Sequence, residues 1–282
     1  MVYITENSLC YTFEKRNYNQ GILNNFVDAT YILTMDNSPR IVNINKELEK
    51  IIPTKIVYIV YNKGFKNCKK ILTEQIAPYD LSDAYFNTIN HSLNNNYNNI
   101  LVLEDDFIFC DKINDTNILN EIKYYFKENE NTEFYFNLGP IPFIFYPSLF
   151  SNTYRGYFTT VSHAIIYNKK LQENLKLKGT TNNIMHWDYF LTTNYKHYFY
   201  KFPLCYQTFP QTNNKIYWES YFPNVNLFLR YIKLDIQPEP GFTIIYKILS
   251  IIHYLILFIF MYLIYILISY VVIPNINLIS LK

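Results

Sequence analysis

A long apolar segment near the C-terminus constrains this chain more than any other feature of its sequence. From Ile248 to Ile273 every residue is apolar or aromatic except two serines and His253. At ~1.5 Å per residue, a helix of about 26 residues spans roughly 39 Å, enough to cross a hydrocarbon core of about 30 Å with some tilt. A buried core helix is the alternative, although an unbroken apolar run of this length favours the membrane. The sequence therefore predicts a transmembrane helix over 244–273.

The charges that flank this segment predict its orientation. Arg230, Lys233 and Lys247 precede it, whereas only Lys282 follows it. The first residues of the chain lack the basic end and apolar run of a signal peptide. Because positive flanks remain on the cytosolic side, we expect a single-pass C-terminal anchor with the large N-terminal part in the cytosol.

The segments before the helix divide the chain into parts. A bend rich in proline and glycine, Gln237 to Gly241, separates the helix from the rest and predicts a linker. We expect an N-terminal extension at 1–24, a folded domain at 25–235, a linker at 236–243, the transmembrane helix at 244–273 and a short tail at 274–282.

Within the folded domain, short apolar runs alternate with helix-like segments. The expected strands are 30–33, 55–60, 100–103 and 134–138, and the expected helices are 44–52, 82–94 and 117–127. Strands that alternate with helices are typical of an α/β domain, with a mainly parallel sheet flanked by helices.

Composition excludes some classes of function. The net charge is +2, from 25 basic and 23 acidic side chains. Binding to nucleic acid needs clustered cations that displace counterions from phosphates. The only local cluster, Lys63, Lys66, Lys69 and Lys70, is typical of a solvated turn. We therefore expect no nucleic-acid partner.

The four cysteines show no metal-binding or redox spacing. Cys10, Cys68, Cys110 and Cys205 are widely separated, and four in 282 residues do not form a disulfide framework. We expect free thiols in a reducing compartment, and the sequence leaves one bridge open.

An acidic triplet carries the main chemical signal. Glu104, Asp105 and Asp106 directly follow the apolar run Ile100–Leu103. If that run is a central strand, the carboxylates lie at its carboxyl end, where open α/β sheets bind ligands. Alternation along an extended backbone would place Glu104 and Asp106 on one side and Asp105 on the other. Oxygen ligands of this kind suit Mn²⁺ or Mg²⁺ bridging to a diphosphate. The alternative is a solvated acidic turn.

Five stretches of sequence together resemble one enzyme family. LVLEDD resembles the signature of glycosyltransferase family 25, the lipopolysaccharide and collagen-type sugar transferases. Other matching stretches occur in the family's order over about residues 30 to 212: TYILTMDNSPR from Thr30, TVSHAIIYNKKLQENL from Thr160, MHWDYFLT from Met185 and FPLCYQ from Phe202. Asp83 departs from the pattern, because the family usually has histidine there.

This resemblance implies a fold and an activity. The fold is GT-A, a Rossmann-like, mainly parallel sheet with an acidic metal motif. The activity is an inverting transfer of a hexose, galactose or glucose, from a UDP-sugar to a glycan, lipid or protein acceptor, usually with Mn²⁺. Two other functions are weighed beside it: a catalytically degenerate, membrane-tethered binding protein with the same fold, and a metal-dependent nuclease or phosphotransferase.

The matched motifs also imply roles for individual residues. The metal ligands would be Glu104, Asp106 and His186; the nucleotide-sugar would contact Asp36, Arg40, Asp105 and His163; the catalytic base would be Asp188. Asp188 reads equally well as the N-cap of a helix, since aspartate is favoured there. His163 reads equally well as a histidine buried in the core.

Overall fold

The computed structural model describes residues 7–178, 184–207 and 236–272, and between 207 and 236 only 224, 227 and 230–234. Its centre is a nine-stranded sheet in the order β1-β3-β2-β4-β9-β6-β10-β8-β7. The strands are β1 (Tyr11–Asn17), β2 (Ala29–Met35), β3 (Ile56–Asn62), β4 (Ile100–Glu104), β6 (Phe134–Asn137), β7 (Ile141–Tyr146), β8 (Thr153–Thr160), β9 (Ala164–Tyr167) and β10 (Lys196–Tyr200). A second sheet pairs β5 (Phe107–Phe109) with β11 (Cys205–Gln207).

The strands that lead to the acidic triplet run parallel to one another. β2 pairs in parallel with β3 on one side and with β4 on the other, and β6 pairs in parallel with β10. β1, β8 and β9 run in the opposite direction to these strands. The expected strands at 30–33, 55–60, 100–103 and 134–138 are therefore confirmed, in a mixed α/β sheet in which most strands share one direction.

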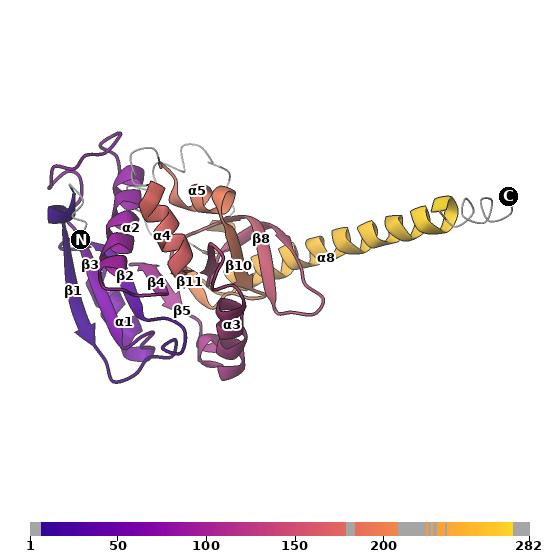
Figure 1. The fold of residues 1–282 in the computed structure, drawn as a ribbon, viewed down its shortest axis with the longest axis horizontal. Coiled ribbons are helices and arrows are strands. Elements are labelled where there is room, and N and C mark those ends of the chain that lie inside the picture. Colours follow the sequence, from indigo (N-terminus) through magenta and orange to yellow (C-terminus); the bar gives the residue numbers. More distant parts are fainter. Residues whose placement is uncertain are drawn as a thin grey trace.

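Helices cover both faces of the sheet (Figure 1). α1 (Ile41–Lys50) and α3 (Thr116–Glu128) share a core with one face, and α2 (Ala77–Asn94), α4 (Lys169–Lys178) and α5 (Trp187–Asn194) share a core with the other. β4 contributes Leu101 and Leu103 to the first core and Ile100 and Val102 to the second. Its uniformly apolar sequence is explained, because a strand between two helical layers is buried on both sides.

The segment 1–24, expected as an extension, supplies an edge strand of the main sheet. β1 pairs antiparallel with β3, with Tyr11 opposite Asn62. The exposed side chains of β1 include charged and polar residues, as is usual for a strand that must not pair with another chain. That polarity is also why the strand has no apolar signal in the sequence.

The structure corrects the prediction that all four cysteines are free. Cys10 and Cys68 form a disulfide with a Cα–Cα distance of 5.7 Å, and Cys110 and Cys205 are free and buried. The bridge depends on tertiary pairing: β1 lies beside β3, so the residue before β1 meets the loop after β3. No spacing rule in the sequence reports such a contact.

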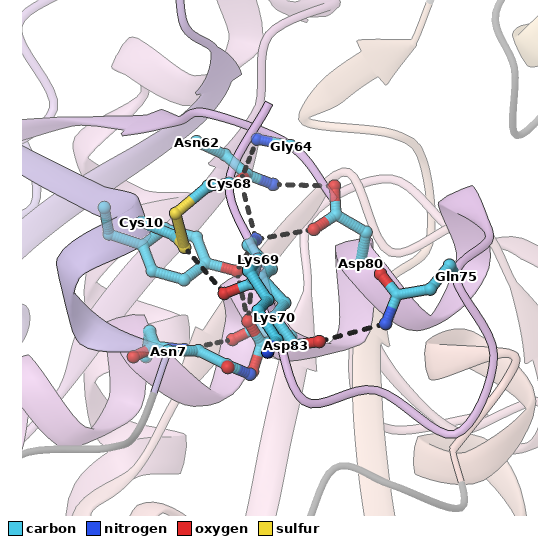
Figure 2. A network of polar contacts seen from close by, with 12 residues as sticks. Asn7, Cys10, Asn62, Gly64, Cys68, Lys69, Lys70, Gln75, Asp80 and Asp83 are labelled. Carbon is cyan, nitrogen blue, oxygen red and sulfur yellow. Dashed lines mark hydrogen bonds and ion pairs between the residues drawn. A yellow bond between two sulfur atoms is a disulfide. The ribbon is translucent and has the colours of Figure 1, made fainter. Parts of the chain in front are cut away.

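Beside this disulfide, Lys70 is buried in a polar network (Figure 2). Its Nζ lies 2.5 Å from Asp80 Oδ1, 2.7 Å from Asn62 Oδ1 and 3.6 Å from Asp83 Oδ2. Tyr11 donates its hydroxyl hydrogen to Asp83. The solvated turn expected for the lysine cluster is therefore wrong for Lys70. Asp83 stands where glycosyltransferase family 25 usually has histidine, and its carboxylate accepts from Tyr11 and lies near Lys70.

The apolar C-terminal segment forms one long helix, α8 (Gly241–Leu267), which projects from the body of the molecule (Figure 1). Within the described residues it is the one helix long and apolar enough to cross a membrane. It begins inside the predicted linker, and Phe242, Ile245 and Tyr246 in its first turns are buried against the sheet. The helix thus begins three residues before the predicted start at 244, and residues 273–282 lie outside the described residues.

Candidate functional site

The candidate site lies at the carboxyl edge of the parallel strands. Because β2, β3 and β4 run in the same direction, the turn after Met35, the end of β3 at Asn62 and the acidic triplet meet along one edge of the sheet. Two later segments reach the same edge. Ser162 precedes β9, which pairs with β4, and Gln207 pairs with Phe107 just after the triplet.

Asp105 forms an ion pair with Arg40. Arg40 Nη1 donates to Asp105 Oδ1 at 2.5 Å, and Thr34 donates to Asp105 Oδ2 at 2.8 Å. Burial lowers the pKa of Arg40, but the charge and hydrogen bond of Asp105 outweigh it, so the net pKa is raised and the side chain stays charged. Within the described residues this pair uses one of the five guanidinium donors, which leaves others for an anion. Two predicted nucleotide-binding residues are thus brought into contact.

Glu104 accepts hydrogen bonds from two hydroxyl groups. Tyr85, on α2, donates to Glu104 Oε1 at 2.7 Å, and Ser162 donates to the same oxygen at 3.1 Å. Burial raises the pKa of Glu104, with further increases from Asp105 and Asp188, and the two hydrogen bonds offset only part of this. Sequence reasoning missed Tyr85, because the stretch before it was compared with the family only up to Ala84 and gave no role to the tyrosine that follows.

The ring of Tyr85 is itself positioned by Trp187. The two rings stack with centroids 4.9 Å apart, and Trp187 donates its indole hydrogen to the hydroxyl of Tyr167 at 2.8 Å. Trp187 is buried in the core. It acts on the site through Tyr85 and so helps to fix the orientation of Glu104.

Asp106 contacts the amide of Gln207. Gln207 Nε2 lies 3.1 Å and 3.3 Å from the two carboxylate oxygens of Asp106, and within the described residues this amide is the one side-chain hydrogen-bond partner of Asp106. Burial raises the pKa of Asp106 well above its ordinary value, and the charges of Glu104 and Asp105 raise it further. The sequence signal for Gln207 was the closing motif FPLCYQ.

The three carboxylates of the triplet have different partners, and the shared side expected for Glu104 and Asp106 stays a prediction. β4 ends at Glu104, and Asp105 and Asp106 form a turn before β5. Alternation applies to extended backbone only. The charge of Asp105 raises the pKa of Glu104 and of Asp106, and the charge of Glu104 raises the pKa of Asp106 further.

Asp188 joins the same acidic group from α5. It lies in the first turn of that helix, where Oδ1 accepts from Tyr189 N–H at 2.9 Å and Oδ2 accepts from Val161 N–H at 3.3 Å. The N-cap is His186, so the N-cap interpretation of Asp188 is wrong. Its charge contributes to the raised pKa of Glu104, and Val161, which donates to Asp188, is adjacent to Ser162, which donates to Glu104.

Backbone strain accompanies this contact. Val161 has a φ of 73°, a region that β-branched residues avoid. Its N–H is bonded to Asp188, and its carbonyl accepts from Asn137 Nδ2 at 2.8 Å. Strained residues persist where the surrounding contacts hold them, and they cluster at functional sites.

The other predicted site residues lie in different environments. Asp36 is exposed in the turn after β2, and His186 is exposed before α5. His163 is fully buried and donates from Nε2 to the Cys205 carbonyl at 3.2 Å, and burial lowers its pKa to about 4. It is therefore neutral, as expected of a core histidine. Direct roles for these three in ligand binding stay predictions.

The donor set at this edge is compatible with a hard divalent cation. No group of three histidine, cysteine, aspartate or glutamate side chains within the described residues forms a ready-made metal site. Asp106 is nonetheless a partly buried carboxylate whose only partner there is a neutral amide. Mg²⁺-type ions are commonly bound by one or two carboxylates together with substrate phosphates, and Glu104 and Asp106 match that pattern.

Comparisons with known proteins do not assign a family. No family model and no curated protein matches the chain. Two solved structures are similar: apo UDP-glucose pyrophosphorylase (13% identity, TM-score 0.34, covering 72% of this chain and 82% of that one) and UDP-glucose pyrophosphorylase complexed with UDP-glucose (12%, 0.35, 72% and 81%). Both TM-scores are low, so we carry no activity over. The GT-A fold and membership of family 25 stay predictions.

Proposed function

We propose that this protein is a membrane-anchored, metal-dependent glycosyltransferase that moves a hexose from a UDP-sugar to a hydroxyl group of a glycan, lipid or protein. The observation that carries the proposal is the placement of four carboxylates at one edge of the sheet: Arg40 binds Asp105 within the triplet, and the adjacent residues Ser162 and Val161 donate to Glu104 and to Asp188. The ordered motifs of the sequence point to a sugar nucleotide as the substrate that this edge binds.

Each residue has a proposed role in that reaction. Glu104 and Asp106 would hold Mn²⁺ or Mg²⁺, which supplies neutralisation of the charge that develops on departing UDP. Arg40, held by Asp105, would direct its remaining donors to the diphosphate. Asp188 would accept the proton of the acceptor hydroxyl, whose oxygen bonds to the anomeric carbon as the bond from that carbon to the phosphate oxygen breaks. The electron pair of the broken bond leaves with UDP.

Turnover of UDP-sugars tests the proposal. The full chain in detergent should release UDP from UDP-glucose or UDP-galactose in the presence of Mn²⁺, and Asp106→Asn should abolish this release. Asp111→Asn is the matched control, because Asp111 is an exposed aspartate five residues further along and should leave turnover unchanged. Binding of UDP without turnover of any UDP-sugar would instead identify a binding protein.

We further propose that α8 spans a bilayer once, with the folded domain in the cytosol, as the positive charges of Arg230, Lys233 and Lys247 predict. The Cys10–Cys68 disulfide favours the opposite side, because disulfides persist in oxidising compartments. Labelling of an introduced, exposed thiol, Val42→Cys, in sealed microsomes decides between them. A membrane-impermeant reagent should reach it without detergent if the domain is cytosolic.

A further inference from the structure

The first half of α8 packs along the hairpin of β7 and β8. The ring of His253 stacks on Phe145 with centroids 4.0 Å apart. One residue later, the Tyr254 hydroxyl donates to the Ser148 carbonyl at 3.0 Å and lies 2.9 Å from the hydroxyl of Tyr154. The contacts thus move towards the tip of the hairpin as α8 proceeds away from the sheet.

Within the described residues, Tyr254 makes the last hydrogen bonds and ring contacts of α8 with the body. From Leu255 to Tyr270 most large side chains of α8 are exposed, and all of them are apolar or aromatic. The described helical segment continues to Val272, so the free part comprises about 18 residues and spans roughly 27 Å, close to the ~30 Å of a hydrocarbon core. Tyrosine is enriched at the boundary between lipid and water, which places Tyr254 at that boundary.

The hairpin tip lies at the same level and is strongly apolar. Phe150 is 99% exposed and Leu149 is 52% exposed, and Tyr146 at the end of β7 is also exposed. The backbone N–H of Lys201, an exposed residue, donates to the Asn152 carbonyl in the same loop at 2.8 Å, and the Asn152 side chain donates to the Glu121 carboxylate at 3.0 Å. Exposed large apolar and aromatic side chains are what inserts into the interfacial region of a bilayer.

We infer that the tip of the β7–β8 hairpin, residues 146–152, is a second membrane contact, which inserts Leu149 and Phe150 into the interface of the bilayer that α8 crosses. The inference rests on the proposed anchor. The bilayer is the occupant that the structure favours, because the hydrogen bonds of Tyr254 attach the loop to α8 where its exposed apolar part begins. If Phe150 stayed in water, its ring would not gain the stabilisation that burial of apolar surface provides.

Depth-dependent quenching tests this inference. Single cysteines replace Phe150, Ile259 or Val42 in the full chain, and each is labelled with an environment-sensitive fluorophore. The unsubstituted chain reports background labelling, which should be low because Cys110 and Cys205 are buried. Val42 is the matched control, an apolar residue 68% exposed on α1, which lies far from α8 (Figure 1). The proteins are reconstituted in vesicles of phosphatidylcholine and phosphatidylglycerol with nitroxide lipids.

We expect the probe at Phe150→Cys to lose most of its emission to a nitroxide near the headgroup. The probe at Ile259→Cys should respond more to one deep in the acyl chains, and the probe at Val42→Cys should respond to neither. If only Ile259→Cys is quenched, α8 spans the bilayer but the hairpin does not touch it, and the inference is overturned. If neither position is quenched, the anchor itself fails. A Phe150 probe that shifts to the blue without quenching would identify a protein partner, and would also overturn the inference.

Discussion

The substitution Lys70→Met tests whether the buried network beside the disulfide stabilises the fold. Methionine retains an unbranched side chain of similar length but removes the ammonium group. In the structure the Lys70 side chain is 0% exposed, and the carboxylates of Asp80 and Asp83 that it contacts are 6% and 4% exposed. After the substitution these two acids would remain buried without their cation.

Removal of one partner from a buried ion pair costs about 3–5 kcal/mol, because the other charge stays desolvated. The free energy of unfolding of a whole domain is only about 5–15 kcal/mol, so this loss would be a large part of the total. For a domain of this size each kcal/mol shifts the melting temperature by about 2–4 °C. We therefore expect Lys70→Met to melt about 6–20 °C lower.

Thermal unfolding of the full chain in detergent, followed by circular dichroism, measures this shift. Lys69→Met is the control: its side chain is exposed, and exposed substitutions usually change stability by less than about 0.5 kcal/mol. The double variant Lys70→Met with Asp80→Asn should regain part of the loss, since it removes one of the stranded charges. Equal melting temperatures for Lys70→Met and Lys69→Met would refute the reasoning.

Three further predictions follow from the site and the core. Asp188→Asn should lower kcat for sugar transfer by about 10²–10⁴-fold while UDP still binds; unchanged kcat would exclude Asp188 as the base. Burial lowers the pKa of His197 to about 4, below its unfolded value of about 6.5, so its stabilising effect is present above pH 6.5 and lost as the pH falls towards 4. Between pH 7 and pH 5, the free energy of unfolding of His197→Gln should therefore fall by about 2 kcal/mol less than that of the unsubstituted chain. Equal decreases for the two chains, measured by urea titration, would contradict this. Cys10→Ser opens a loop with a sequence separation of 58 and should lower the free energy of unfolding by about 4 kcal/mol, because the unfolded chain gains entropy. Equal stability of Cys10→Ser and the unsubstituted chain without reductant would contradict this.

The elements that the sequence predicts well are those with strong apolar patterns. β4 is recognisable because Ile100 to Leu103 are buried on both faces of the sheet. The site follows from it, since residues directly after a central strand must emerge at its carboxyl edge. Arg40 and Gln207 were likewise found through local motifs, and both contact the triplet.

The contacts that the sequence does not report join segments far apart in the chain. Tyr85 reaches Glu104 from α2, and Cys10 reaches Cys68 through the pairing of β1 with β3. Lys70 looks solvated in the sequence, because only the fold brings Asp80 and Asp83 to it.

Because the first turns of α8 are packed into the body, the helix would fix the distance between the candidate site and the membrane. A catalytic domain on a flexible tether samples a volume that grows with tether length, and so can meet acceptors at many heights. Here Phe242 and Tyr246 are buried in the body, and the same helix continues to Leu267. The carboxyl edge of the sheet would therefore stay at one distance from the membrane and tilt with the helix. Such an enzyme would select its acceptors partly by height, favouring hydroxyl groups presented at a fixed distance above the lipid.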